Sequence, residues 1–279
     1  MNETKSVKAL KKQMAAAIAM VCVAAVALGS STYAWFVNNN KVEATTTNIS
    51  AQSNSAYLVI DTKATSTTST SSATAAEEVG EGKKYPDKAI YPAQWANGFA
   101  EDKSTTGTKI YQFETAYASD KEKADENTDT RFAVGAPEAA VTADYAIGNK
   151  FFIGTGTYDG EFTNLKVDKL SVSTPSNVAD SKGLDAALRV LVYIDQNNWA
   201  VVSKTGVEKS CSAGTVVTEG TNLGIIHTAA FGKTTGDVEM TLYVYYDGAD
   251  QQVYTTNLEN LQKEVGATVS FSATATEHK

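Results

Sequence analysis

The 279-residue chain is acidic, because 32 Asp and Glu residues outnumber 24 Lys and Arg residues and give a formal charge of −8. This balance disfavours nucleic acid as a partner, since phosphate binding needs clustered basic side chains. Two cysteines cannot form the disulfide framework of a small secreted scaffold, so stability must come from a hydrophobic core, which a chain of this length can bury.

Residues 1–34 have the layout of a secretory signal peptide. Four lysines precede an uninterrupted apolar run, Met14–Leu28, and the small side chains of Thr32 and Ala34 suit the two positions that a signal peptidase reads. The apolar run is about 15 residues long, which is shorter than the roughly 20 that a membrane span needs. We therefore expect cleavage between Ala34 and Trp35.

An uncleaved membrane anchor is the alternative for the same segment, because no charge occurs between Lys12 and Lys41. The protein would then contact a membrane through this segment alone. Cleavage would remove four lysines and one glutamate, changing the formal charge from −8 to −11. It would also remove Cys22 and leave Cys211 as the single thiol, which we interpret as a small, half-buried residue.

The first part of the predicted mature chain combines strands with polar loops. Residues 42–52 favour an extended strand, and residues 57–60 form an apolar run typical of a buried strand. Residues 61–84 are rich in Ser and Thr and lack periodicity, which predicts an exposed loop. Residues 118–131 are dominated by charges and predict a second solvated loop.

The central region is rich in aromatic side chains. Residues 85–100 combine four aromatic residues with two prolines, which indicates an irregular segment whose rings pack on the edge of the domain. Residues 109–117 alternate like a strand with an aromatic face. The pair Gly148-Asn149 is interpreted as a turn or bulge between two short strands, 145–147 and 151–153.

The last third of the chain predicts regular strands separated by turns. Turns are expected at residues 195–199 and 247–248, and a short helix at residues 257–265. Strands are expected at residues 165–173, 187–194, 200–202, 216–217, 224–226, 240–246 and 267–276. We therefore expect an all-β fold: a β-sandwich with long loop insertions and one or two short helices, preceded by a signal-peptide helix.

Three segments near the start of the chain, 31–36, 42–45 and 48–52, resemble the N-termini of the camelysin/TasA family. These are Gram-positive secreted proteins processed by a dedicated, SipW-type signal peptidase. Three later segments, 188–193, 242–250 and 268–273, look like the paired late strands of TasA-like domains. The resemblance implies a jelly-roll-like domain over residues 35–279, secreted to the cell surface or the biofilm matrix.

The resemblance also implies a structural subunit of fibres that assembles with copies of itself, with or without an accessory matrix protein. An apolar strand freed by cleavage could complete the sheet of a neighbouring subunit through main-chain hydrogen bonds. Folding of the same segment onto its own domain, which would give a monomer, is the alternative. The donor strand is predicted within residues 35–52, with Trp35, Phe36, Val37, Val42, Ala44 and Ile49 as its apolar side chains.

Two alternatives to a structural subunit are a surface adhesin and a camelysin-like metalloendopeptidase. The chain has only two histidines, His227 and His278, and lacks the His-Glu-x-x-His pattern of zinc proteases. Gly-x-Ser-x-Gly and phosphate-binding glycine loops are also absent. We therefore expect no enzymatic activity, no catalytic residues, no cofactor and no metal site.

Overall fold

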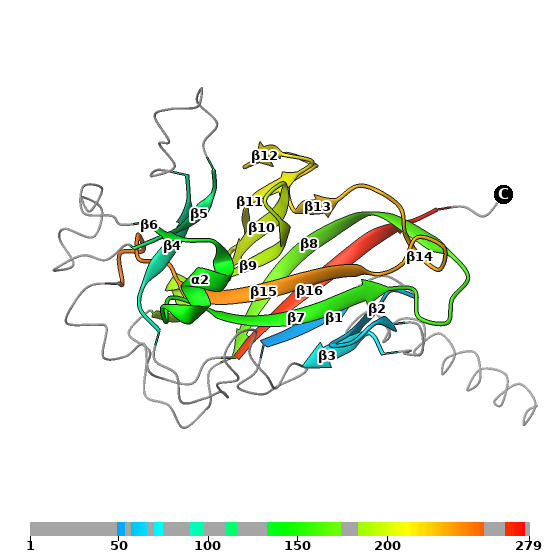
Figure 1. The fold of residues 1–279 in the computed structure, drawn as a ribbon, viewed down its shortest axis with the longest axis horizontal. Helices are drawn as coiled ribbons and strands as arrows, with labels where there is room; N and C mark the ends of the chain where they lie inside the picture. The colour runs from blue at the N-terminus through cyan, green and yellow to red at the C-terminus, as the bar shows by residue number, and fades with distance from the viewer. Residues whose placement is uncertain are drawn as a thin grey trace, which may run out of the picture. The chain divides into compact units, whose positions relative to one another are not determined.

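The computed structural model describes residues 49–53, 57–65, 70–74, 90–97, 110–115, 133–173, 184–253 and 266–276. These residues form three β-sheets and two short helices, α2 (Pro137–Thr142) and α3 (Leu184–Ala187) (Figure 1). The expected all-β class is therefore confirmed. The segment 1–34, the charged loop 118–131 and the predicted helix 257–265 lie outside the described residues.

Sheet A contains both the first and the last strand. Its six members are β1 (Ile49–Ser53), β3 (Ser72–Thr74), β8 (Glu161–Ser173), β13 (Ile225–His227), β14 (Phe231–Gly232) and β16 (Gly266–Ala275). The strand order is β13-β8-β16-β1-β3, and β14 also pairs with β8. The long antiparallel pair of β8 and β16 forms the centre of this sheet.

Sheet B has seven strands and includes the strands that we predicted at residues 187–194, 200–202 and 240–246. Its members are β2 (Val59–Asp61), β7 (Ile147–Gly154), β9 (Leu188–Asp195), β10 (Asn198–Ser203), β11 (Gly206–Ser212), β12 (Thr215–Val217) and β15 (Val238–Tyr246), in the order β12-β11-β10-β9-β15-β7-β2. The predicted turn at 195–199 joins β9 to β10, where the Asp195 carboxylate accepts a hydrogen bond from the amide of Asn197 at 2.7 Å.

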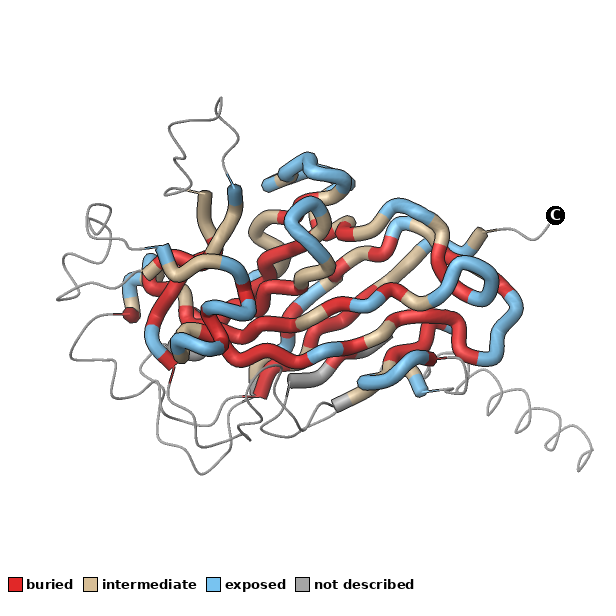
Figure 2. The backbone as a smooth tube through the Cα atoms, in the orientation of Figure 1, coloured by how far each residue is buried: buried red, intermediate tan, exposed pale blue. Residues whose placement is uncertain are grey.

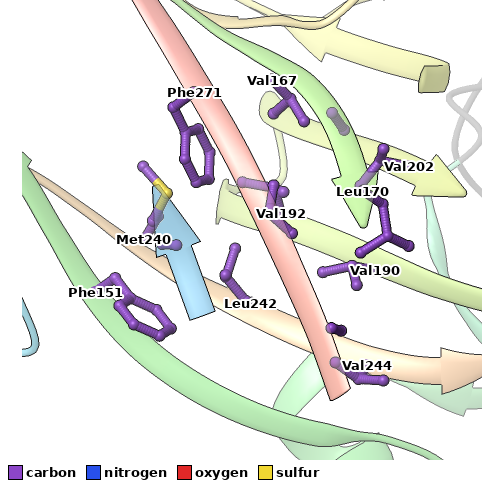
Figure 3. Packing of buried hydrophobic residues seen from close by; sticks show 14 of the residues in the cluster. Phe151, Val167, Leu170, Val190, Val192, Val202, Met240, Leu242, Val244 and Phe271 are labelled. Atoms are coloured by element: carbon purple, nitrogen blue, oxygen red, sulfur yellow. The ribbon is translucent and has the colours of Figure 1, made fainter. Parts of the chain in front are cut away.

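Sheets A and B face each other across a common hydrophobic core. Strand β8 contributes Val167 and Leu170, β16 contributes Phe271, and their side chains meet residues from sheet B in one buried cluster (Figure 3). The sheet B side of this cluster includes Phe151, Val190, Val192, Val202, Met240, Leu242 and Val244. Two sheets packed face to face through alternate side chains constitute a β-sandwich arrangement.

A third, small sheet lies against the other face of sheet B. Sheet C consists of β4 (Ala93–Ala96), β5 (Gln112–Thr115) and β6 (Ala133–Gly135). Its Trp95 and Phe113 are buried in a second cluster with Trp199, Tyr243 and Tyr245 of sheet B. The aromatic residues that we placed on the domain edge therefore include one, Trp95, that forms part of a buried layer.

Coverage on both faces explains why the central strands of sheet B are so apolar. In β9, Val190 and Val192 enter the core shared with sheet A, whereas Leu191 enters the cluster shared with sheet C. Accordingly, buried residues lie along the middle of sheet B, and exposed residues lie mainly in the loops (Figure 2). A strand buried on both faces appears in the sequence as a continuous hydrophobic run instead of an alternating one.

The expected turn at Gly148-Asn149 is wrong, because both residues lie inside the continuous strand β7. A Cβ atom at Gly148 would approach the Tyr243 ring within 2.8 Å. The glycine therefore provides room for an aromatic ring on the neighbouring strand β15, not a change of chain direction.

Two short elements lie in segments where we predicted neither a helix nor a strand. The exposed loop predicted over the Ser/Thr-rich segment 61–84 is wrong at residues 72–74, because strand β3 lies there and pairs with β1. Helix α2 begins with Pro137, a residue whose missing N–H and fixed φ suit the first helical position, and Glu138 follows in the first turn.

Candidate functional site at the first and last strands

The first described strand, β1, lies between the last strand, β16, and the short strand β3. It is parallel to β16, with Ile49 opposite Ala267 and Ser53 opposite Phe271. It is antiparallel to β3, with Ala51 opposite Ala73. Both hydrogen-bonding edges of β1 are therefore used within its own chain.

Strands β1 and β16 both place side chains in the core shared by sheets A and B. Ala51 is fully buried in the core shared by sheets A and B, and burial of one methyl-sized side chain contributes about 1 kcal/mol. Strand β16 places Ala267, Val269 and Phe271 in the same core. Parallel pairing is also slightly less stable per residue than antiparallel pairing.

Strand β16 is anchored on its other edge without help from β1. It pairs with β8 in antiparallel fashion from Gly266, opposite Ser173, to Ala275, opposite Phe162. The Ser272 hydroxyl also donates a hydrogen bond to the Asp168 carboxylate at 2.8 Å. The edge of β16 that receives β1 is thus held in place by β8, as a strand-binding site must be.

Most of the predicted site residues lie outside the described residues. This holds for the cleavage residues Thr32, Ala34 and Trp35 and for the donor residues Phe36, Val37, Val42 and Ala44. Ile49 is the exception, because it begins β1 and pairs in its own sheet. The donor strand remains a prediction.

A half-buried charge cluster, which was not expected from the sequence, lies on the sheet C side of sheet B. The Arg189 guanidinium forms an ion pair with Glu208 at 2.8 Å and lies 3.7 Å from carboxylate oxygens of both Asp247 and Asp250. Burial raises the pKa of the Asp247 carboxyl above its ordinary value, although Arg189 and the amide of Ala249 oppose the rise. Arg189 therefore neutralises carboxylates that water reaches poorly.

Lys209 extends this cluster to sheet C. Its Nζ donates a hydrogen bond to the Trp95 carbonyl oxygen and lies 5.4 Å from the centre of the Tyr111 ring. Burial lowers the pKa of the Lys209 ammonium, while Asp247, Glu208 and Glu114 oppose the decrease. The lysine thus fastens strand β4 to strand β11 through a charge-assisted hydrogen bond.

Neither the histidine nor the cysteine in the described residues belongs to a metal-binding group. His227 ends strand β13, contacts the Phe231 ring edge-to-face, and has its pKa lowered by burial. The prediction of a half-buried Cys211 is wrong, because this residue is buried on strand β11. Within the described parts of the chain, no three His, Cys, Asp or Glu side chains are grouped so that they could hold a metal ion.

Across the described ranges, neither helix has the length and apolar character required to cross a bilayer. No known family model, curated protein or solved structure matches the chain.

Proposed function

We propose that the chain is a structural subunit of fibres on the cell surface or in the biofilm matrix, as its resemblance to the camelysin/TasA family suggests. In this proposal, a SipW-type signal peptidase cuts between Ala34 and Trp35 and releases the mature protein outside the cell. Residues 35–52 of one subunit then add to the sheet of the next subunit.

The observation that supports this proposal best is the parallel pairing of β1 with β16. The strand is five residues long, overlaps the end of the predicted donor segment 35–52, and buries the side chain of Ala51. The edge of β16 is meanwhile held by β8. A neighbour's equivalent strand could replace β1 at the same register with no net loss of main-chain hydrogen bonds.

Exchange of this kind produces an open chain of subunits. The donor segment of each copy occupies the acceptor edge of the next, so donor and acceptor surfaces differ and the contact does not close on itself. Burial of Trp35, Phe36 and Val37 on the neighbour would supply apolar area beyond what β1 gives up. That additional burial is the driving force for assembly.

Charge is expected to control the rate of assembly. Each mature subunit would carry a formal charge of −11, and like charges repel at ionic strengths where screening is weak. Raising the salt concentration from about 0.01 M to about 0.15 M shortens the Debye length from roughly 30 Å to 8 Å. Filament growth followed by light scattering should therefore accelerate over this range.

A reversible covalent lock tests the exchange directly. Ala51 and Val269 are opposite each other on β1 and β16 and are both buried, so the double variant A51C/V269C should form a disulfide. In mature protein of residues 35–279, the oxidised variant should give no filaments by electron microscopy, and reduction should restore them. The single variant A51C should form filaments under both conditions.

Two results would refute the strand-exchange proposal. One is filament formation by the oxidised double variant to the same extent as by its reduced form. The other is filament formation by a variant that lacks residues 35–52. Mass spectrometry of the N-terminus of protein from culture supernatant tests the cleavage site separately, since a leader retained on the chain would contradict secretion of a free subunit.

The jelly-roll topology is part of the same proposal. The chain passes from β7 in sheet B to β8 in sheet A and back to β9 in sheet B, and from β15 in sheet B to β16 in sheet A. Such crossings between facing sheets are typical of jelly rolls. The meander β9-β10-β11-β12 and sheet C would then be additions to the basic arrangement.

A further inference from the structure

Two tyrosines from distant parts of the sequence stack on each other at the surface. The rings of Tyr57 and Tyr158 have centroids 4.6 Å apart and planes inclined by 13°. Tyr57 is 61% exposed and Tyr158 36% exposed. Two phenol rings thus lie in contact where dissolved reagents can reach them.

The local backbone holds both rings in this position. Tyr57, just before β2, has a left-handed backbone with φ of 66°. Tyr158 lies in the connection between β7 and β8, where its amide donates a hydrogen bond to the Thr155 carbonyl at 2.9 Å. A Cβ at Gly160 would lie 1.9 Å from the Tyr158 ring, so a side chain at this position would displace the ring from its present place.

The stacking of Tyr57 on Tyr158 adds little net free energy to the stability of the fold. A left-handed backbone at a tyrosine costs about as much free energy as one exposed aromatic pair contributes. The stack is therefore better explained by what two adjacent phenols can do together than by its effect on folding.

We propose that Tyr57 and Tyr158 form an intramolecular dityrosine cross-link when the protein meets hydrogen peroxide and a peroxidase-type one-electron oxidant. Each phenol loses one electron and its phenolic proton, and the two radicals join by a carbon–carbon bond between ring carbons ortho to the hydroxyls. The two ring hydrogens then move to the oxygens and restore both phenols. The two electrons and two protons released convert one hydrogen peroxide into two water molecules.

The bond would tie the start of β2 to the connection between β7 and β8. Cross-linking residues so far apart in sequence removes conformational freedom from the unfolded chain, as a disulfide that closes a long loop does. The cross-linked protein should therefore unfold at a higher urea concentration than the untreated protein. This inference does not depend on the proposed assembly into fibres.

A second tyrosine pair provides an internal control. Tyr91 is 62% exposed, close to the exposure of Tyr57, and its ring lies 5.8 Å from that of Tyr145 with a tilt of 51°. This pair is further apart and not parallel. If stacking geometry directs the reaction, the Tyr57–Tyr158 product should form several-fold faster than the Tyr91–Tyr145 product.

The test treats dilute mature protein with a peroxidase and hydrogen peroxide and maps cross-linked peptides by mass spectrometry. We expect one dominant monomeric product in which the peptides containing Tyr57 and Tyr158 are joined and lighter by two hydrogen atoms. The variants Y57F and Y158F should each lose this product, whereas Y91F should keep it. Urea unfolding of the untreated variants checks that phenylalanine has preserved the fold.

Three results would overturn the inference. They are equal yields from the two tyrosine pairs, products formed only between molecules, and unmodified Tyr57 and Tyr158 peptides after other tyrosines have reacted.

Discussion

The Asp237 carboxylate clamps Thr65 through two hydrogen bonds. One oxygen accepts from the Thr65 amide at 2.6 Å and the other from the Thr65 hydroxyl at 2.7 Å. Thr65 is fully buried, just after β2, and Asp237 immediately precedes β15. The pair therefore joins the chain after an edge strand of sheet B to the start of an inner strand.

Removal of this clamp should destabilise the protein measurably. In D237A the buried amide and hydroxyl of Thr65 lose a charged acceptor, and we expect the free energy of unfolding to fall by about 1–3 kcal/mol in urea titrations. D159A is the matched control, because Asp159 is 85% exposed and 3.5 Å from Lys233. Equal losses in the two variants would show that the clamp has no special role.

Replacement of Gly154 by a larger residue should lower the stability of the protein, because Gly154 lies against the hydrogen-bonded pair of Asp237 and Thr65. A Cβ at this position would be 1.9 Å from an Asp237 oxygen and 2.3 Å from the Thr65 hydroxyl oxygen. We expect G154A to lower the free energy of unfolding by about 1–3 kcal/mol, as overpacking does. The loss should be smaller when G154A is introduced into D237A, because the nearest clashing atom is gone; additive losses would contradict this explanation.

Much of sheet B could be predicted from the sequence because its signals are local. The hydrophobic run at residues 240–246 and the polar turn after Asp195 depend on neighbours in the chain, and both appear in the structure, the run as part of strand β15. Strands β1 and β16 were likewise expected as extended segments. Their parallel pairing could not be predicted, since nothing in either strand specifies a partner so far away.

The features that were missed depend on contacts between distant residues. The pair Gly148-Asn149 is typical of a turn in sequence. Only the Tyr243 ring on the adjacent strand explains why Gly148 lies inside β7. In sheet C, strand β5 was expected within residues 109–117, whereas β4 and β6 are only four and three residues long, too short for a clear period. Arg189 was recognised as part of a hydrophobic strand, but its acidic partners come from β11 and from the turn after β15.

Arg189 should contribute to stability because its buried guanidinium neutralises a group of half-buried carboxylates. Its side chain is 11% exposed and faces Glu208, Asp247 and Asp250. We expect R189M to lower the free energy of unfolding by about 1–3 kcal/mol, because these carboxylates would lose the guanidinium that forms ion pairs with them and only Lys209 would remain near them. The control is K150M, which breaks an exposed ion pair with Glu239 at 2.5 Å and should cost less than about 1 kcal/mol.

The raised pKa of Asp247 predicts a specific pH dependence. Burial makes the folded protein bind this proton more tightly than the unfolded chain does, so Asp247 lowers stability at neutral pH relative to acid. As pH falls from above the folded pKa toward the ordinary value of 3.8, protonation of Asp247 removes this penalty. D247N has no such proton to gain. The free energy of unfolding of the wild type, measured relative to D247N by urea titration between about pH 7 and pH 4, should therefore rise as the pH falls. A constant or decreasing difference would mean that Arg189 holds the pKa of Asp247 at or below its ordinary value.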